Sequence, residues 1–217
     1  MVAGLALGQA LGSAQNTALT NTQEMHRLHQ DSKASIARME DPMREAYQKP
    51  REVVSALKIE ESEVIADIGA GSGYFTFRLA EAAGAKGRVY AVDVSPDMIV
   101  HLNRRIRDLN VKNVVTKLSA PDDPLLGDAS VNRVLICDTW HHIGSHDKYL
   151  ALLKKILKPG GQVVMIDFKK IKTPVGPPME MRIDRDDLVR EMEANGFQLE
   201  TEHTFLEYQY FLVFKVK

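Results

Sequence analysis

Three glycines at alternate positions, Gly69, Gly71 and Gly73, follow an apolar run at residues 64–68 that has the character of a buried strand. Glycine lets a backbone approach a ligand where a side chain would collide, and α/β proteins bind ligands at the carboxyl ends of such strands. The next apolar run ends at Asp93, whose carboxylate can accept hydrogen bonds from two hydroxyl groups. Together these residues predict a nucleotide-type ligand at the glycine loop.

The residues around the loop narrow the class of nucleotide. A dinucleotide fingerprint needs a further glycine three residues beyond Gly71, and this chain has Tyr74 there. A phosphate-binding P-loop needs Gly-Lys-Ser/Thr, and no such triplet follows these glycines. The sequence therefore argues against NAD and against ATP held by a P-loop.

A second group of polar residues follows the apolar run at residues 131–137 and contains Asp138, His141 and His142. The end of that run belongs to the same carboxyl edge of the predicted sheet, so these residues should border the reacting group. A histidine there can act as a general base near neutral pH, although alignment of the reactants can supply the larger share of the rate. We expect a substrate-side role for at least one of the two histidines; the alternative is that one of them only packs or bonds to the backbone.

The same residues together with His146 also suggest a metal cluster, but the pattern for one is poor. No cysteine pattern and no spaced carboxylate–histidine pattern supports such a cluster, and a metal needs converging ligands of fixed geometry. We therefore predict no metal site.

Three segments, DIGAGSGYF, AVDVSPDM and LKPGGQVVMIDF, resemble the motifs of the class I S-adenosylmethionine-dependent methyltransferases, and the resemblance runs from about residue 52 to the C-terminus. It implies S-adenosylmethionine as the cofactor, with Asp67 and the glycine loop around its methionine portion. It also implies Asp93 on the ribose hydroxyls and Val94 and Met98 beside the adenine. The cofactor-binding residues expected from it are Asp67, Gly69, Ala70, Gly71, Ser72, Gly73, Tyr74, Asp93, Val94, Met98, Asp122 and Asp138.

Some positions depart from patterns found among related enzymes. Many place Gly-Asp-Ala after the third strand to bind the adenine amino group, whereas this chain has Ala120 there, and we take Asp122 as the substitute. The alternative is that Asp122 and Asp123 only form the turn before Pro124. No Asn/Asp-Pro-Pro-aromatic motif follows the fourth strand, which argues against adenine-N6 and related amide acceptors, and the single Cys137 argues against arsenite.

Short β-branched runs alternate with amphipathic helical stretches, which is typical of βαβ units on a parallel sheet. We predict an α/β fold: a Rossmann-like doubly wound sheet of five parallel strands plus a C-terminal antiparallel hairpin, with helices on both faces and an N-terminal helical lid. The predicted strands are residues 64–68, 88–92, 114–118, 131–137 and 162–167, with the hairpin at 197–204 and 208–216. The predicted helices are 74–83, one opening at Ser95-Pro96, 149–157 and 185–194.

Three regions are predicted along the chain. Residues 1–24 are predicted to be a flexible leader or the remnant of a secretory signal. The first 23 residues carry no charge, and the run at 5–14 resembles the apolar part of such a signal, although no basic segment precedes it. Residues 25–57 form a two-piece helical lid interrupted at Asp41-Pro42, and residues 58–217 form the S-adenosylmethionine-binding methyltransferase domain. The substrate-binding candidates, from the fourth strand end, the lid and the loop at 176–182, are Tyr47, Gln48, Trp140, Met179 and Arg182.

Composition limits the remaining choices. With 217 residues, 44% hydrophobic and 26% charged, the chain has the composition of an ordinary globular protein. Its 28 basic and 29 acidic residues give a formal charge of −1, which disfavours nucleic acid as a partner. No apolar run reaches the roughly 18 to 20 residues of a membrane span, so we predict no membrane association.

We predict an enzyme that moves the methyl group of S-adenosylmethionine to an oxygen, nitrogen or sulfur atom of a small molecule. The alternatives are a protein or RNA methyltransferase, with an open charged groove beside His141, and a non-catalytic S-adenosylmethionine-binding subunit. We favour the cytoplasm, where the cofactor is made, while the signal-like leader keeps the periplasm as an alternative. The acceptor, the attacked atom and the oligomeric state are left open by the sequence.

Overall fold

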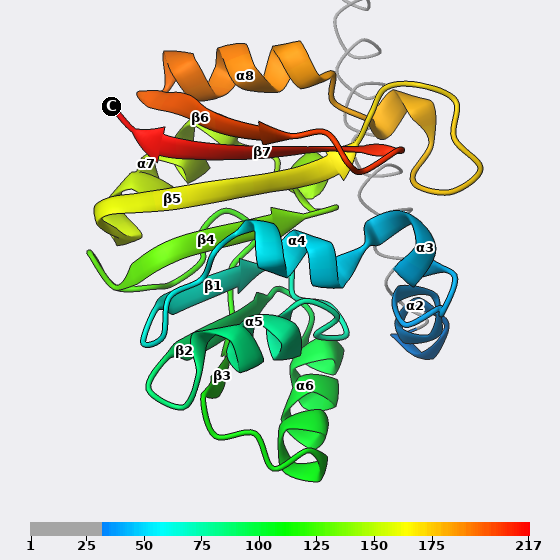
Figure 1. Ribbon diagram of the computed structural model, residues 1–217, viewed down its shortest axis with the longest axis vertical. Coiled ribbons are helices and arrows are strands. Elements are labelled where there is room, and N and C mark those ends of the chain that lie inside the picture. The colour runs from blue at the N-terminus through cyan, green and yellow to red at the C-terminus, as the bar shows by residue number, and fades with distance from the viewer. Residues whose placement is uncertain (1–31) are drawn as a thin grey trace, which may run out of the picture. The chain divides into compact units, whose positions relative to one another are not determined.

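The computed structural model describes residues 32–217 (Figure 1). The chain divides into two compact units, Met1–Arg38 and Met39–Lys217, and every site described below belongs to the second. The first described helix, α2, spans Ser32–Met39, and within it the Arg38 guanidinium donates to Ser35 Oγ at 3.3 Å. The predicted leader at residues 1–24 lies outside the described residues and stays a prediction.

Seven strands form one sheet in the order β3-β2-β1-β4-β5-β7-β6. Strands β1 to β5 pair in parallel, and β7 pairs antiparallel with both β5 and β6. This confirms the predicted sheet of five parallel strands with an antiparallel hairpin. Their bounds are β1 Val64–Ile68, β2 Arg88–Asp93, β3 Val114–Leu118, β4 Val131–Cys137, β5 Leu157–Phe168, β6 Phe197–His203 and β7 Gln209–Val216.

Helices cover both faces of this sheet, as predicted, and two apolar cores result. On one face Leu79 and Leu102 pack with inward residues of the central strands, and on the other Leu150 and Leu188 do the same. The first core is covered by α4 (Pro50–Ala56), α5 (Thr76–Ala83) and α6 (Pro96–Asp108), and the second by α7 (His146–Ile156) and α8 (Arg185–Ala194). The strand order reverses between β1 and β4, and doubly wound folds bind ligands at this point of reversal.

Two predicted boundaries are wrong. The region predicted as a two-piece helical lid, residues 25–57, contains three described helices. Lys49 adopts a left-handed φ of 43° that ends α3 (Arg44–Gln48) before Pro50 begins α4. The fifth strand begins at Leu157, five residues before the predicted start at Gln162. A register irregularity in the pairing of β4 with β5 keeps the segment 159–161, which lies between the predicted helix and the predicted strand, within β5. The predicted break at Asp41-Pro42 does separate α2 from α3.

The topology brings five chain segments to one edge of the sheet. The parallel strands β1, β2, β4 and β5 end there, and β7 begins there because it runs antiparallel to β5. Helix α3 and the long loop between β5 and α8 lie beyond the arrowheads of β4 and β5 (Figure 1). Within the described residues, no helix combines the length and the apolar character needed to cross a bilayer.

Candidate functional site

The glycine loop after β1 has a backbone that only glycine adopts easily. Gly69, Gly71 and Gly73 have φ angles of 73°, 54° and 85°, all in the left-handed region. A Cβ on Gly69 would lie 2.2 Å from Thr139 Oγ1, and one on Gly71 would lie 2.6 Å from Met39 Sδ. The loop is therefore pressed between the segment after β4 and the start of the second unit.

Asp93, at the end of β2, holds this loop through its carboxylate. Its Oδ2 accepts from the Gly71 amide at 2.8 Å and its Oδ1 from the Ser95 amide at 2.9 Å, and the residue is 8% exposed. A carboxylate has about four lone-pair positions, so it can accept more hydrogen bonds than these two amides donate. Of the two residues expected beside the adenine, Met98 is buried and Val94 is exposed.

Two further buried polar side chains belong to this region, one on β1 and one in the loop itself. Asp67 is buried on β1 and accepts from the Thr76 hydroxyl at 2.6 Å, and burial raises the pKa of Asp67 to about 6. The Ser72 side chain is fully buried, and its Oγ finds no hydrogen-bond partner among the described residues. An unpaired buried hydroxyl in a backbone cradle shaped by three glycines suits a ligand that carries polar atoms. These residues, with Ala70 between them, fit S-adenosylmethionine.

Tyr74, expected to bind the cofactor, faces the lid. Its ring lies between two guanidinium groups, with Arg44 Cζ 4.0 Å and Arg78 Cζ 4.4 Å from the ring centroid. Its hydroxyl donates to Glu45 Oε1 at 3.2 Å, and burial followed by the charge of Glu45 raises the pKa of Tyr74. The start of α3 is thus fixed to the residue that follows the glycine loop.

His141 and Asp167 form a buried pair at the edge. The His141 Nδ1 lies 2.9 Å from Asp167 Oδ2, and each side chain is 3% exposed. Burial alone would lower the pKa of His141, but the hydrogen bond and charge of Asp167, with the charge of Asp138, outweigh it and raise the pKa. His142 is exposed, and its ring lies 4.2 Å from that of His141. Of the two predicted histidines, His141 is the one oriented by a carboxylate.

Asp138 lies beside this pair in an unusual backbone conformation, with φ 51°. Gln209 Nε2 donates to its Oδ1 at 2.7 Å, and a guanidinium nitrogen of Arg44 lies 3.8 Å from its Oδ2. Burial and the charge of Asp167 raise the pKa of Asp138 to about 7, while Arg44, Gln209 and His141 act to lower it. This carboxylate is held from two sides.

Two substrate-binding candidates on α3 reach the same edge. The centroid of the Tyr47 ring lies 6.0 Å from that of Phe168 and 6.2 Å from that of Tyr208, and burial raises the pKa of Tyr47. Gln48 is fully buried and donates to Gln209 Oε1 at 2.9 Å. Tyr47 and Gln48 therefore lie at the same edge as Asp138 and the His141–Asp167 pair, and their substrate-binding role stays a prediction.

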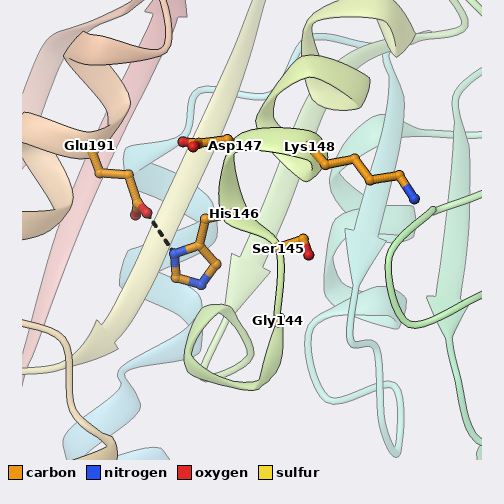
Figure 2. A pocket seen from close by; sticks show the side chains of 6 residues that line it. All are labelled: Gly144, Ser145, His146, Asp147, Lys148 and Glu191. Atoms are coloured by element: carbon orange, nitrogen blue, oxygen red, sulfur yellow. Dashed lines mark hydrogen bonds and ion pairs between the residues drawn. The ribbon is translucent and has the colours of Figure 1, made fainter.

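Trp140 lies elsewhere than predicted. It is 1% exposed, stacks on His146 at 4.3 Å and donates through Nε1 to Glu191 Oε2 at 3.1 Å, so it is a core residue between α7 and α8 rather than a neighbour of the substrate. Figure 2 shows the His146 ring pointing at Glu191, with Nδ1 2.7 Å from Oε1. The surface hollow in that view is lined by Gly144, Ser145, His146, Asp147, Lys148 and Glu191. No three His, Cys, Asp or Glu side chains between residues 32 and 217 are placed to hold a metal ion.

Asp122, Arg182 and Met179, which were also predicted to bind the cofactor or the substrate, have other surroundings in the structure. The Asp122 carboxylate pairs with Lys148 at the surface, which lowers the pKa of Asp122. It would have to leave that pair to bind adenine. Arg182 is buried and donates to four main-chain carbonyls, those of Lys169, Ile171, Val175 and Pro177. Arg182 organises the loop before α8, where Met179 is exposed.

Three residues of this site were missed in the sequence, and two of them carried a usable signal. Asp167 is the second-last residue of β5, so it belongs to the same edge as Asp138. Gln209 opens β7, and an antiparallel strand begins where its parallel neighbours end. Arg44 had no signal beyond its place in the lid.

Comparisons with known proteins identify the family of the chain. A family model described as a methyltransferase domain matches residues 59–206. A ubiquinone/menaquinone biosynthesis C-methyltransferase, UbiE, of Hydrogenovibrio crunogenus is 26% identical over 126 residues, which are 58% of this chain and 50% of the relative. A demethylmenaquinone methyltransferase of Tropheryma whipplei is 25% identical over 163 residues, or 69% of this chain and 66% of that protein. The chain thus spans about half to two thirds of the length of these curated relatives.

Solved structures show the same fold. A SAM dependent methyltransferase from Aquifex aeolicus superposes with a TM-score of 0.81 at 26% identity, covering 85% of this chain and 98% of that one. The 1,6-didemethyltoxoflavin-N1-methyltransferase of Burkholderia thailandensis, solved with S-adenosylhomocysteine, gives a TM-score of 0.58 at 19% identity over 100% of this chain and 93% of that one. The second likeness is one of fold alone.

Proposed function

We propose that this protein, which belongs to the class I S-adenosylmethionine-dependent methyltransferase family, transfers the methyl group of its cofactor to a small organic acceptor. The observation that carries the proposal is the covered acceptor edge. The buried His141–Asp167 pair stands beside Asp138, and Tyr47 and Gln48 of α3 lie over the same edge. An edge covered by short elements of the chain itself suits a small molecule better than a polymer.

Bound S-adenosylmethionine would supply a methyl group attached to a positively charged sulfur. Once the methyl group is transferred, that sulfur is the neutral thioether of S-adenosylhomocysteine. The chain's part is to fix the two reactants. Asp93 would accept from the ribose hydroxyls, and the glycine loop lets the methionine portion lie close to the backbone. Because Gly69 abuts Thr139, the cofactor loop and the acceptor edge are neighbours, and alignment at that junction supplies much of the rate.

His141 is placed to take a proton from the acceptor. Asp167 can only accept a hydrogen bond when ionised, so His141 Nδ1 carries the hydrogen and Nε2 is left as the basic atom. An acceptor that loses a proton as it is methylated would deliver it to that nitrogen. Because the pKa of His141 is raised, the basic form increases as the pH rises above the ordinary histidine range.

The named relatives widen the set of acceptor atoms. The Hydrogenovibrio relative is named a C-methyltransferase of ubiquinone/menaquinone biosynthesis, so a ring carbon made nucleophilic by an adjacent ionised hydroxyl joins oxygen, nitrogen and sulfur as a candidate. A base such as His141 would serve that ionisation. We place the activity in the cytoplasm, where the cofactor is made.

The test is methyl transfer from isotopically labelled S-adenosylmethionine to a panel of phenols, amines, thiols and hydroxylated aromatic rings. We expect a labelled small product, a loss of about 10² to 10⁴ in rate for His141→Gln, and a change within about threefold for the exposed neighbour His142→Gln. Label found in lysate protein or RNA, with none in any small acceptor, would contradict the small-molecule proposal. S-adenosylhomocysteine binding without transfer to any acceptor would instead indicate a non-catalytic subunit.

A further inference from the structure

Four side chains from three separate segments form a closed polar ring at the acceptor edge. Arg44 and Gln48 come from α3, Asp138 follows β4, and Gln209 begins β7. Arg44 Nε donates to Gln48 Oε1 at 3.1 Å, Gln48 Nε2 to Gln209 Oε1 at 2.9 Å, and Gln209 Nε2 to Asp138 Oδ1 at 2.7 Å. The ring closes where the Arg44 guanidinium lies 3.8 Å from Asp138 Oδ2.

All the hydrogen bonds of the ring run in one direction, from the cation to the anion. Gln48 and Gln209 are 0% and 1% exposed, so their amide groups cannot turn to water for partners. Reversing the Gln209 amide would place its oxygen against the Asp138 carboxylate and its NH₂ against the Gln48 NH₂. The two neighbours therefore set the orientation of Gln209, and Gln209 in turn sets that of Asp138.

The ring depends on the docking of α3. This helix has only five residues, and helices so short are not stable in isolation. Its position is fixed by side-chain contacts, namely those of Gln48 and Arg44 in the ring and those of Arg44 and Glu45 with Tyr74. Asp138 has a left-handed backbone that a residue with a side chain seldom adopts, so it too is held by its surroundings.

We propose that Gln209 is a positioning residue for methyl transfer, which joins α3 to Asp138 so that the acceptor edge is assembled only while α3 is docked. The inference rests on the proposed function, because it assigns Asp138 to the acceptor side of the methyl transfer. Docking of the lid and orientation of the carboxylate then become a single event.

The ionisation of Asp138 reports whether the ring is intact. Gln209 and Arg44 both favour the charged carboxylate, so the pKa of Asp138 rises when either contact is lost. Asp167 opposes them. The titratable or charged groups that face Asp138 are Arg44 and Tyr47 on α3, Cys137 on β4, Asp167 on β5, Tyr210 on β7 and His141 in the 3-10 helix Trp140–His142.

The experiment is a carbon-13 NMR titration of the side-chain carboxyl groups in the full chain, with Asp138 assigned from Asp138→Asn. In Gln209→Leu we expect Asp138 to titrate about one pH unit higher, as for the loss of one hydrogen bond to a charged group. Amide hydrogen exchange in α3 should accelerate at least tenfold. The matched control is Gln162→Leu, since Gln162 pairs with Lys215, near the end of β7 away from Gln209, and its side chain contacts Arg133 and Glu200. It should change neither signal.

Gln48→Leu provides a second test if Gln209→Leu does not fold, because it opens the same ring from the lid side. It should accelerate exchange in α3 and move the Asp138 titration in the same direction. The proposal is overturned if Asp138 titrates as in the wild type in the folded variants, or if exchange in α3 is unchanged. Wild-type binding of S-adenosylhomocysteine is measured separately: its absence would remove the proposed function, whereas normal binding with an unmoved Asp138 would remove only the role of Gln209.

Discussion

Replacing Gly69 by alanine should destabilise the protein by more than its backbone conformation explains. The left-handed φ of 73° costs an alanine about 1 to 2 kcal/mol. The new Cβ would also lie 2.2 Å from Thr139 Oγ1 and 2.4 Å from its Cγ2, and such overpacking costs about 1 to 3 kcal/mol more. We therefore expect Gly69→Ala to lower the free energy of unfolding by about 2 to 5 kcal/mol.

Gly160→Ala separates the two contributions. Gly160 has a similar φ of 77°, but a Cβ there would meet nothing within 4 Å. Urea unfolding followed by circular dichroism should show Gly160→Ala losing only the backbone cost, and Thr139→Ala should restore about 1 to 2 kcal/mol to Gly69→Ala in a double-mutant cycle. If Gly69→Ala costs no more than Gly160→Ala, the close junction between the cofactor loop and the acceptor edge is refuted.

Three further predictions concern charge. Asp93→Asn should weaken S-adenosylhomocysteine binding in calorimetry by about 10- to 100-fold, because an NH₂ group replaces one of the two carboxylate oxygens that accept hydrogen bonds. Unchanged affinity would contradict the ribose role. Asp167→Asn should lower kcat and move the acid limb of its pH profile to lower pH, since losing that carboxylate lowers the pKa of His141; a limb that stays in place would contradict the base assignment. Both nitrogens of His146 face acceptors, Glu191 Oε1 and a main-chain carbonyl, and its pKa is raised, although burial opposes this. That stabilisation, about 1 kcal/mol, is fully present below the unfolded histidine pKa of about 6.5 and is lost as the pH rises through the folded value. The stability lost in Glu191→Gln should therefore shrink from pH 5.5 to 7.5 in urea unfolding, and a constant loss would count against the imidazolium.

The strands and the cofactor loop could be predicted because local chemistry determines them. β-branched runs define β1 and β4 with the bounds predicted, and glycines at three left-handed positions identify the loop. β5 was mispredicted because a bulge lets Pro159 to Gly161 stay in a strand, and proline and glycine there otherwise indicate a loop.

The acceptor edge could be predicted only in part because its residues converge from distant segments. Asp167 reaches His141 only after β5 pairs beside β4, and Gln209 reaches Asp138 only because β7 runs antiparallel. Trp140 was assigned to the substrate from its place in the chain, yet the tight turn after β4 directs its ring into the core toward Glu191. A run of polar residues at a strand end does not say which side chain turns inward.

The central claim is that the glycine loop and Asp93 form an S-adenosylmethionine site rather than a dinucleotide site. Calorimetric titration of the full chain with S-adenosylhomocysteine and, separately, with NAD tests it most directly. The structure predicts saturable binding of S-adenosylhomocysteine at one site per chain and none of NAD, because Tyr74 occupies the position where the dinucleotide fingerprint needs glycine. Binding of NAD, or of neither ligand, would contradict the account.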